Sequence, residues 1–478
     1  MAETNRNIPL CVDLDGTLIS GDALLESCVS VMKIKPWLLF AYPFWLIKGK
    51  THFKNRLASY YLPNPDSFSY RHDIVDFLLT EKENGRKLVL ATAAVQETAD
   101  AVAEHLKIFD MALGTGKEKN LRSAHKAEVL CSIFGEKAFD YMGNSSADLK
   151  VWQKADGAIL VDTPKSITKK AKEQSNVIKE FHYDYNKLKV FIKEIRVYQW
   201  LKNLLIFLPL LMAHKLDSSQ PFLYALLGFI SFSLSASSVY VLNDLMDLDS
   251  DRHHPRKRRR PIASGKISIP WAVIIFLVLL IAGLSISIMF LPENFTYVLL
   301  FYLVLTTAYS LFLKKIYIVD IFILSILYTI RIIAGALAVD VPASKWLLAF
   351  SVFIFLSLAI VKRYTELKVM ISLNKKSTKG RGYHVDDIGL LMNIGPASGY
   401  LAVLVFALYI YSPEVIRLYK HPEFLWPVAI CIMFWITRIW FLAHRGRMHD
   451  DPIVFTGKDY VSYIIGFVIA ILVIGAAL

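Results

Sequence analysis

Long apolar stretches constrain the fold of this chain more than any other feature. From about residue 203 to the end, apolar runs alternate with short loops that are mostly basic. A run of about 20 apolar residues is long enough to cross a bilayer as a helix. We count nine such segments, near residues 203–214, 222–242, 271–291, 296–313, 317–338, 346–361, 391–411, 424–443 and 460–478. The first is short unless Val197 to Lys202 extends it. The sequence therefore predicts an all-α polytopic membrane bundle of about nine transmembrane helices.

The charge of the loops predicts an orientation. Basic residues gather in alternate loops, near residues 243–270, 314–315, 362–388 and 444–458. Such loops face the cytosol in most membrane proteins. The polar start MAETNRN also carries no secretory signal, which independently predicts a cytosolic N-terminal domain. We expect an integral protein of the bacterial cytoplasmic (inner) membrane, with the N-terminal domain and the active sites in the cytosol.

The first 190 residues have the mixed composition of a soluble domain. Short apolar runs end at Val12, Thr92, Gly143 and Val161, with helix-like segments between them, which is typical of a parallel α/β fold. Asp13 and Asp15 follow the first run, so they are predicted to lie at the carboxyl edge of the sheet, where such folds bind ligands. We predict two parts, residues 1–190 and 191–478.

Composition limits the classes of partner. The net charge of +13 suits anionic lipid headgroups and phosphorylated substrates. Because the basic residues are spread over membrane-flanking loops, nucleic acid is not predicted as a partner. The four cysteines form no CxxC pair, so neither a zinc site nor a disulfide framework is expected. The sequence leaves open whether the protein forms a homo-oligomer.

An acidic stretch, Asn243 to Gly265, follows the second apolar run. On a helix at about 100° per residue, four oxygen-bearing side chains share one face. They are Asn243, Asp244, Asp247 and Asp251. Their carboxylates repel one another and need a counter-charge, for which Mg²⁺ is the simplest candidate. Arginines including Arg256 and Arg260 follow at once, and guanidinium groups beside Mg²⁺ suit a diphosphate or a phosphosugar. The alternative is a solvated loop that only sets topology.

Further candidate residues recur on the same predicted side of the membrane. Tyr309, Lys314 and Asp320 lie around the turn between the fourth and fifth helices. Arg331 lies at membrane depth, where an ionisable residue is costly unless it is paired or functional. Lys362 and Arg381 belong to the next basic loop, together with Arg363 and Glu366. For each residue alone, interfacial snorkelling is an equally good explanation.

Four ordered motifs in the N-terminal part resemble the haloacid dehalogenase superfamily of phosphatases. They are VDLDGT around Asp13, Thr92 after LVLA, Lys126 in HKAEVL, and Gly143 to Asp148. The resemblance implies a Rossmann-like α/β domain with a cap. It implies that Asp13 attacks phosphorus, that Asp15 acts as acid and base, and that Thr92 and Lys126 hold the phosphoryl oxygens. Asp13, Asp148 and the main-chain carbonyl of Asp15 would hold Mg²⁺.

This part departs from the superfamily pattern at one position. Asn144 stands where the superfamily usually has Asp, which removes a negative charge near the metal. A degenerate domain kept for docking is the alternative. The cap would lie between Thr17 and about Asn84. Within it, Pro36 to Ile47 is very apolar but too short to span a bilayer, so it is either an interfacial segment or a buried cap helix.

The membrane part resembles the UbiA superfamily of intramembrane prenyltransferases, through NDxxDxxxD at Asn243 to Asp251 and RPIASG after it. A second DxxxD motif is missing, since Asp320 is followed by Ile-Phe-Ile-Leu. RVYQWLKN and KRYTEL resemble the decaprenyl-phosphate phosphoribosyltransferase branch. There, Mg²⁺ on the Asp-rich motif holds phosphoribosyl pyrophosphate (PRPP), and the acceptor is polyprenyl phosphate. Basic residues would hold the phosphates, with Lys202, Lys362 and Arg381 as candidates for the lipid phosphate.

Three functions remain open from the sequence. The favoured one is a bifunctional enzyme of cell envelope biosynthesis, which makes polyprenyl-phosphoryl-5-phosphoribose and then removes the 5-phosphate. The second is a UbiA-type prenyltransferase that uses a prenyl diphosphate and an aromatic or other acceptor. The third is a membrane scaffold or transporter with a vestigial phosphatase domain. The missing DxxxD argues against the second, and the face of aspartates argues against the third.

Overall fold

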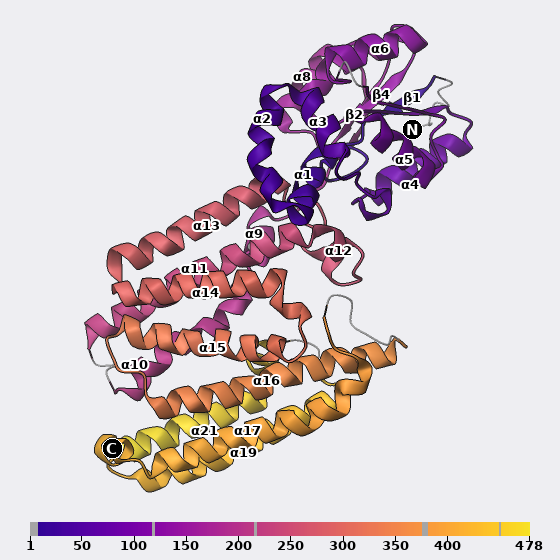
Figure 1. Cartoon of the computed structure of the whole chain (residues 1–478). Coiled ribbons are helices and arrows are strands. Elements are labelled where there is room, and N and C mark those ends of the chain that lie inside the picture. Colours follow the sequence, from indigo (N-terminus) through magenta and orange to yellow (C-terminus); the bar gives the residue numbers. More distant parts are fainter. Residues whose placement is uncertain (1–7, 117–119, 215–217, 375–380, 449–450) are drawn as a thin grey trace. The chain divides into compact units, whose positions relative to one another are not determined.

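The structure is a computed structural model that describes residues 8–116, 120–214, 218–374, 381–448 and 451–478 (Figure 1). By contacts the chain forms two compact units. The first comprises Met1–Glu194 and Val241–Ile274, and the second comprises Ile195–Tyr240 and Ile275–Leu478. The Asp-rich stretch therefore clusters with the N-terminal residues, although it follows the second apolar run in sequence.

The first unit contains a six-stranded parallel sheet, which confirms the predicted α/β fold. Its strands are β1 (Leu10–Val12), β2 (Leu88–Val95), β3 (Met111–Thr115), β4 (Asp140–Gly143), β5 (Ala158–Val161) and β6 (Val177–Phe181). The order is β3-β2-β1-β4-β5-β6, so β1 lies between β2 and β4. Val12 pairs with both Leu90 and Met142. The ends of these three central strands therefore meet at one edge.

Helices cover both faces of this sheet. One face carries α4 (His72–Glu83) and α5 (Gln96–Leu106). The other carries α6 (Ala124–Phe134), α7 (Leu149–Lys154) and α8 (Lys165–Gln174). Because both faces are covered, the central strands are continuous apolar runs without alternation. A final helix, α9 (Lys187–Glu194), ends this part of the unit.

A small helical cap is inserted between β1 and α4, as predicted. It contains α1 (Ala23–Ile34), the 3₁₀ segment η1 (Pro36–Ala41), α2 (Tyr42–Ile47) and α3 (Lys50–Ala58). Asp22 caps α1 by accepting a hydrogen bond from the Leu25 amide. Gly49, with φ of 102°, allows the turn from α2 into α3. Val31, Phe53 and Leu57 form the buried core of the cap.

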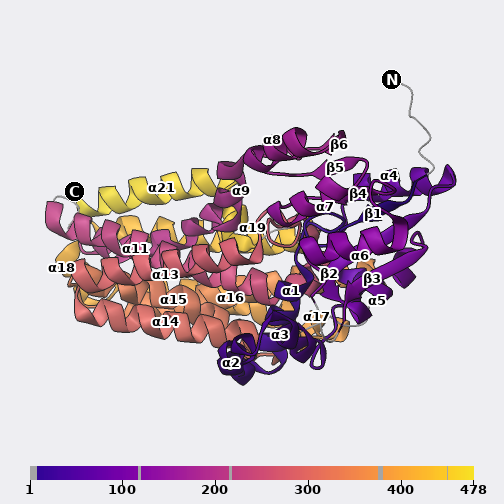
Figure 2. The ribbon, with the colours of Figure 1, turned by 90° about the horizontal axis from the view of Figure 1, so that it is seen from above.

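Eight helices of the described residues are long and apolar enough to cross a membrane. They are α11 (Ser219–Met246), α13 (Ile269–Phe290), α14 (Glu293–Leu311), α15 (Val319–Ala338), α16 (Lys345–Ser372), α17 (Ile388–Ile410), α19 (Leu425–His444) and α21 (Tyr460–Ala477). Neighbouring helices such as α14, α15 and α16 run side by side (Figures 1 and 2). The all-α bundle is thus confirmed.

Of the nine predicted segments, eight correspond to helices of spanning length among the described residues, and the first is shorter. The first predicted segment forms η4 (Val197–Phe207) and α10 (Leu208–Met212), a shorter apolar stretch in which the first part is 3₁₀ and Pro209 follows. Val197 to Lys202 does extend it, as the sequence suggested.

The short elements of the described chain are η2 (Pro65–Ser67), η3 (Ser146–Asp148), α12 (Leu248–Arg252), η5 (Lys257–Arg259), η6 (Leu313–Lys315), η7 (Val385–Asp387), α18 (Pro413–Leu418), η8 (Pro422–Phe424) and α20 (Pro452–Thr456).

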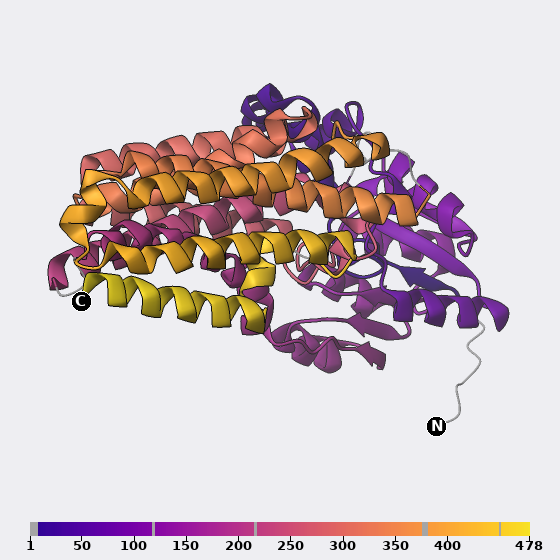
Figure 3. The same cartoon turned by 90° about the horizontal axis from the view of Figure 1, so that it is seen from below.

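Small residues allow α16, α17 and α19 to pack closely (Figure 3). A Cβ on Gly395 of α17 would collide with the ring of Trp440. The Ser357 hydroxyl donates to the Gly395 carbonyl at 2.7 Å, and the Trp440 indole donates to Ser357 at 3.1 Å. Such close approach with interhelical hydrogen bonds is how membrane helices associate.

Candidate active sites

The first site lies at the carboxyl edge of the sheet, around Asp13. The Oδ1 atom of Asp13 accepts hydrogen bonds from the Lys126 ammonium at 2.8 Å and from the Leu14 amide at 3.0 Å. Lys126 stands in the first turn of α6 and is buried. Burial raises the pKa of Asp13 to about 6, and the charge of Lys126 opposes that rise. A buried nucleophile candidate is thus held by one buried cation.

Asp15 faces the cap. Its Oδ1 atom accepts from the amide of Ala23, the first residue of α1, at 2.8 Å. Burial raises the pKa of Asp15 well above its ordinary value, and the nearby charge of Asp22 adds to the rise. A carboxyl group that retains its proton is suited to protonating a leaving group.

The last motif closes the site from β4. Oδ2 of Asp148 accepts from the backbone amides of Asn144 at 3.1 Å and Ser145 at 2.9 Å. Its Oδ1 accepts from the Tyr141 hydroxyl at 3.0 Å, and Lys126 donates to that same hydroxyl at 2.8 Å. Asp13 and Asp148 are therefore linked through Lys126 and Tyr141.

Asn144 and Thr92 also lie where their motifs predict. A Cβ on Gly16, whose φ is 72°, would collide with the Asn144 amide, so the last motif packs against the DxDGT turn. Thr92 is buried in β2, next to β1, and its hydroxyl accepts from the Ala94 amide at 3.0 Å. The sheet thus gathers all four motifs at one edge.

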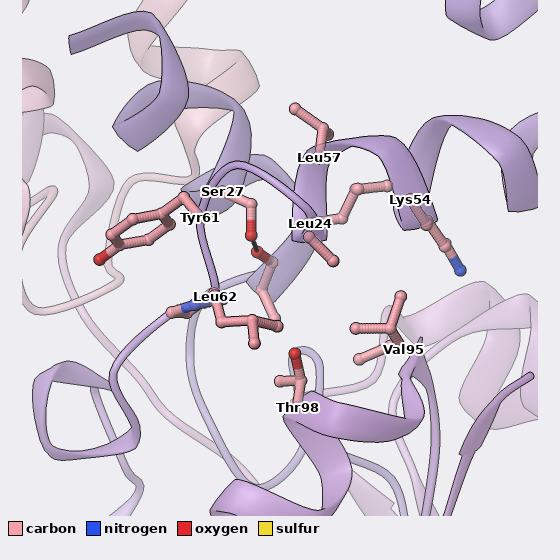
Figure 4. Close-up of a pocket in the computed structure, with 12 residues that line it drawn as sticks. Leu24, Ser27, Lys54, Leu57, Tyr61, Leu62, Val95 and Thr98 are labelled. Carbon is pink, nitrogen blue, oxygen red and sulfur yellow. Dashed lines mark hydrogen bonds between the residues drawn. The ribbon is translucent and has the colours of Figure 1, made fainter. Parts of the chain in front are cut away.

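Lys54 is a buried cap residue that the sequence did not single out. From α3 its ammonium group donates to the Ala93 carbonyl at 2.5 Å and to Asn120 Oδ1 at 2.9 Å. Burial lowers its pKa. In Figure 4 the ammonium group points away from Leu24 and Leu57, which line a cavity of about 20 Å³ under the cap. No motif marks Lys54, because its position depends on how the cap packs.

The oxygen atoms at this edge suit Mg²⁺. Two buried carboxylates, Asp13 and Asp148, lie close enough that the charge of Asp148 raises the pKa of Asp13. The predicted ligand set adds the main-chain carbonyl of Asp15, with Asn144 at the same edge, and oxygen ligands are those a hard cation prefers. Across the described residues no three His, Cys, Asp or Glu side chains are gathered for a metal, and this set needs only two carboxylates.

The second site is the Asp-rich stretch. Helical hydrogen bonds continue through it, from the Asp247 amide to Asn243 and from the Asp251 amide to Asp247, both at 2.8 Å. The buried carboxylates of Asp244 and Asp251 converge on Nη1 of Arg260, at 2.9 and 2.5 Å. One cationic nitrogen therefore lies between two carboxylates. A hard divalent cation could be bound by the same two carboxylates.

The remaining candidate residues of the stretch are more exposed than Asp244 and Asp251. Asp247 is half-buried and lies 3.8 Å from the Lys33 ammonium, while Asn243 is half-buried and Arg256 is exposed. The third carboxylate is thus not gathered with the other two, consistent with the finding that no three acidic, histidine or cysteine side chains of the described chain form a metal cluster.

A buried ion pair ties this stretch to the cap. Arg252 binds Glu26 of α1 through two parallel bonds, of 2.7 and 2.8 Å, and its Nε donates to the Ala263 carbonyl at 3.0 Å. A cavity of about 220 Å³ lies beside the pair, lined by residues that include Lys33, Tyr61 and Met246. Sequence reasoning missed the pair, since Glu26 belongs to no motif and lies far from Arg252 in the chain.

In the second unit, the described residues include a cluster with more cations than carboxylates, Lys202, Lys362, Arg331 and Asp451, which we call the unbalanced cluster. Lys202 and Lys362 donate to Oδ2 of Asp451 at 2.8 and 3.0 Å. The Tyr328 ring lies 5.4 Å from the Lys202 ammonium and 5.6 Å from the Arg331 guanidinium. Within the described residues, two lysines therefore share one carboxylate, and a third cation, Arg331, lies on the same tyrosine ring.

Arg331 makes only neutral hydrogen bonds within the described part of the chain. It donates to Asn203 Oδ1 at 2.8 Å, to the Tyr302 hydroxyl at 3.1 Å and to the Leu327 carbonyl. The rings of Phe232 and Tyr302 lie 5.2 and 5.0 Å from its guanidinium. It is buried in α15, where a cation without a carboxylate is expensive.

A neighbouring cluster has, among the residues that the structure describes, two arginines and two carboxylates, and we call it the balanced cluster. Arg363 binds Asp320 through both Nε and Nη2, and it binds Glu366 at 2.6 Å. The Tyr309 hydroxyl donates to Asp320 at 2.7 Å. Arg381 lies 3.6 Å from Asp320 and 3.5 Å from Glu366. The partners of Asp320 are thus protein groups.

Comparison with known proteins identifies the family of the membrane part. Residues 204–458, more than half of the chain, match the UbiA prenyltransferase family. The chain belongs to this family.

Relatives of this UbiA-family chain carry three kinds of name. An uncharacterised protein y4nM of Sinorhizobium fredii is 37% identical over 98% of this chain and 90% of its own length. The nodulation protein NoeC of Azorhizobium caulinodans is 36% identical, over 57% of this chain and 89% of its own. A decaprenyl-phosphate phosphoribosyltransferase of Mycobacterium tuberculosis is 38% identical, over 37% of this chain and 59% of its own.

Solved structures match each part separately. A UbiA homologue from Archaeoglobus fulgidus, bound to DMAPP and Mg²⁺, is 15% identical, covers 60% of this chain and 97% of its own, and has a TM-score of 0.45. A hydrolase of the haloacid dehalogenase family from Salmonella enterica is 14% identical, over 38% of this chain and 72% of its own, with a TM-score of 0.28.

Within this UbiA-family chain, the structure assembles more than the motifs predicted. Lys202, Lys362 and Arg331 were predicted, but Asp451, Asn203 and Tyr328 were not. Asp451 lies between α19 and α20. Nothing in its local sequence distinguishes it from a charged loop residue that only sets the orientation of the helices in the membrane. Lys314, a predicted phosphate ligand, lies half-buried in η6.

Proposed function

We propose that residues 191–478 transfer 5-phosphoribose from PRPP to polyprenyl phosphate, and that residues 1–190 then remove the 5-phosphate. The observation that carries the proposal is the unbalanced cluster, in which Lys202 and Lys362 share one carboxylate and the buried Arg331 nearby has only neutral partners among the described residues. An anionic substrate group is the natural complement of such a cluster. Similarity to decaprenyl-phosphate phosphoribosyltransferases supports phosphate-bearing substrates.

The transfer is a displacement at the anomeric carbon of the ribose. An oxygen of the lipid phosphate forms the new bond to C1, and pyrophosphate leaves with the electron pair of the broken bond. The lipid phosphate is already an anion, so no strong protein base is needed. Lys202, Lys362 and Arg331 hold phosphate groups in this proposal, while Arg260 and Lys314 are further candidates.

In this proposal the Asp-rich motif binds the donor, PRPP. Asp244 and Asp251, with Asp247 and Asn243 beside them, would hold Mg²⁺, which when bound neutralises charge on the diphosphate. Arg260 would then be released from the carboxylates and become available to a phosphate oxygen. Asp320 and Tyr309, by contrast, hold Arg363, and we propose a structural role for them.

The phosphatase step uses the four motifs at the sheet edge. Asp13 attacks the phosphorus of the 5-phosphate, and Asp15 protonates the departing ribose oxygen. Thr92 and Lys126 hold the phosphoryl oxygens. Asp15 then takes a proton from the water that hydrolyses the aspartyl phosphate. Asp13, Asp148, Asn144 and the carbonyl of Asp15 would hold Mg²⁺, which when bound lowers the charge repulsion between Asp13 and the phosphate.

The basic loops support a location in the bacterial inner membrane, with both activities on the cytosolic side. PRPP is water-soluble and polyprenyl phosphate is a membrane lipid, so the proposed enzyme must contact both the cytosol and the bilayer. Removal of the 5-phosphate would make the sequence of two reactions run forward.

Turnover of ribose-labelled PRPP with polyprenyl phosphate and Mg²⁺ tests the proposal, using purified wild type and Asp13→Asn. Wild type should form lipid-linked ribose, and the variant should stop at lipid-linked 5-phosphoribose. Chelation of divalent cations should abolish both products. If both proteins stop at the 5-phosphate, the N-terminal domain is inactive on this product. If labelled lipid never forms while a prenyl diphosphate is consumed, the chain is a prenyltransferase.

A further inference from the structure

The apolar cap segment, Pro36–Ile47, exposes large apolar side chains. Trp37 is 64% exposed, Phe40 78%, Phe44 68% and Ile47 82%. No residue of η1 or α2 is buried. Of the two alternatives that the sequence left open for this segment, the buried cap helix is therefore wrong. An amphipathic helix on a soluble domain would instead direct such side chains into the core.

One side of this segment is firmly anchored to the rest of the cap. The Trp45 ring stacks on Tyr60, with ring centroids 5.8 Å apart, and the Tyr42 hydroxyl donates to the Cys28 carbonyl at 2.8 Å. Tyr42 also packs edge-on against the buried Phe53. The exposed side chains therefore belong to an ordered element with two faces, one packed and one apolar and open.

Charge around the segment indicates what covers the open face. Lys33 and Lys35 precede it, Lys48 and Lys50 follow it, and the sequence has no acidic residue between Glu26 and Asp66. An apolar face with lysines at both ends complements an anionic lipid surface. Two copies packed through this face would bring the lysines of both together, which disfavours self-association.

We propose that the apolar cap segment inserts into the headgroup region of the bilayer that the chain's own helices span. The membrane is always within reach, because the same polypeptide carries eight helices of spanning length. Insertion of Phe40, Phe44 and Ile47 removes their apolar surface from water, and the lysines lie among anionic headgroups. The inference rests on exposure and charge and does not depend on the reaction.

Insertion has a consequence that does rest on the proposed function. The helix after the segment, α3, carries Lys54 to the carbonyl next to Thr92. One cap element would thus contact both the membrane and the phosphatase site. A phosphate group attached to a membrane lipid could then be hydrolysed while its lipid chain stays in the bilayer.

Depth-dependent fluorescence quenching tests the insertion directly. Full-length protein with Cys28, Cys131 and Cys431 replaced by serine carries one new cysteine, Phe44→Cys or Ile47→Cys, labelled with NBD. Cys11 is fully buried and remains. The matched control is Leu79→Cys on α4, a position 42% exposed in the same unit. Proteins are placed in nanodiscs of phosphatidylcholine and phosphatidylglycerol that contain a shallow spin-labelled lipid.

Both cap labels should be quenched at least about threefold more strongly than the Leu79 label. Lys48→Gln with Lys50→Gln should reduce the cap quenching about twofold, and removal of phosphatidylglycerol should do the same. Quenching equal to that of the Leu79 label at both cap positions would overturn the proposal. Cap labels that are shielded only when two copies share a nanodisc would identify a second copy as the occupant. The readout needs no turnover, so it can fail or succeed independently of the proposed reaction.

Discussion

Lys362 and Arg363 are adjacent on α16, yet they belong to two different ion clusters. Arg363 lies in the balanced cluster, where two arginines face two carboxylates. Lys362 lies in the unbalanced cluster, where two lysines share Asp451 and Arg331 has neutral partners in the described residues. Each cluster combines a buried cation, Lys202 or Arg363, with partly exposed ions such as Lys362 or Arg381. The difference shows that burial of a charged group alone does not mark a binding site, whereas an excess of one charge among the described residues favours an anionic ligand.

The largest effect is expected from Arg331→Gln. This change removes a buried cation that we assign to a phosphate group, so the rate of ribose transfer should fall by at least about 100-fold. Thermal stability in detergent should change little, because the guanidinium has neutral partners. Initial rates with labelled PRPP, normalised to folded protein, provide the measurement. A variant with a near-normal rate would remove Arg331 from the site.

Arg363→Gln should damage stability more than chemistry. It leaves Asp320 buried without its principal partner, which costs about 3–5 kcal/mol for a buried pair broken on one side. Thermal unfolding in detergent should show the loss. The double variant Arg363→Gln with Asp320→Asn should recover much of it, since the uncompensated charge is gone. An Arg363→Gln protein that is stable but inactive would place this cluster in the binding site.

Lys362→Gln should produce a smaller change, mainly in substrate affinity. Asp451 keeps Lys202 at 2.8 Å, so the fold should be retained. We expect the KM for polyprenyl phosphate to rise about tenfold, the usual size of one lost charge-assisted hydrogen bond. Lys362→Arg preserves the charge and should recover part of the affinity. An unchanged KM together with a lower Tm would argue that Lys362 only neutralises Asp451.

The smallest effect concerns pH. Burial alone would raise the pKa of Asp451, but Lys202 and Lys362 outweigh it and hold that pKa well below its ordinary range. A depressed carboxyl pKa stabilises the fold above the unfolded value of about 3.9, and that contribution is lost as pH falls through the folded value. The Tm difference between wild type and Asp451→Asn should therefore stay constant between about pH 5 and pH 8. A difference that shrinks across this range would mean that Asp451 titrates there.

The sequence predicted the phosphatase-like site more completely than the membrane site, for a physical reason. A parallel sheet brings the ends of its central strands to one edge, so residues that follow β1, β2 and β4 must meet. Asp13, Thr92 and Asp148 therefore come together whatever the loops between them do. Lys54 and Tyr141 were missed because their positions depend on packing.

No comparable rule places side chains inside a helical bundle. Arg331 could be selected because charge at membrane depth is rare, and Lys202 could be selected because it belongs to RVYQWLKN. Asp451 could not, because it lies in a basic loop where a charged residue is ordinary. The sequence also could not show that Asp320 would be satisfied by Arg363, or that Arg331 would have neutral partners, since charge balance depends on which helices pack together.

The most direct test of the central claim follows PRPP labelled in its 5-phosphate. With polyprenyl phosphate and wild-type protein, the label should first enter the lipid fraction and then be released as inorganic phosphate. With Arg331→Gln, entry into the lipid should nearly cease. If wild-type protein never moves the label into the lipid, or if Arg331→Gln does so at the normal rate, the unbalanced cluster is not the phosphate-binding site proposed for it.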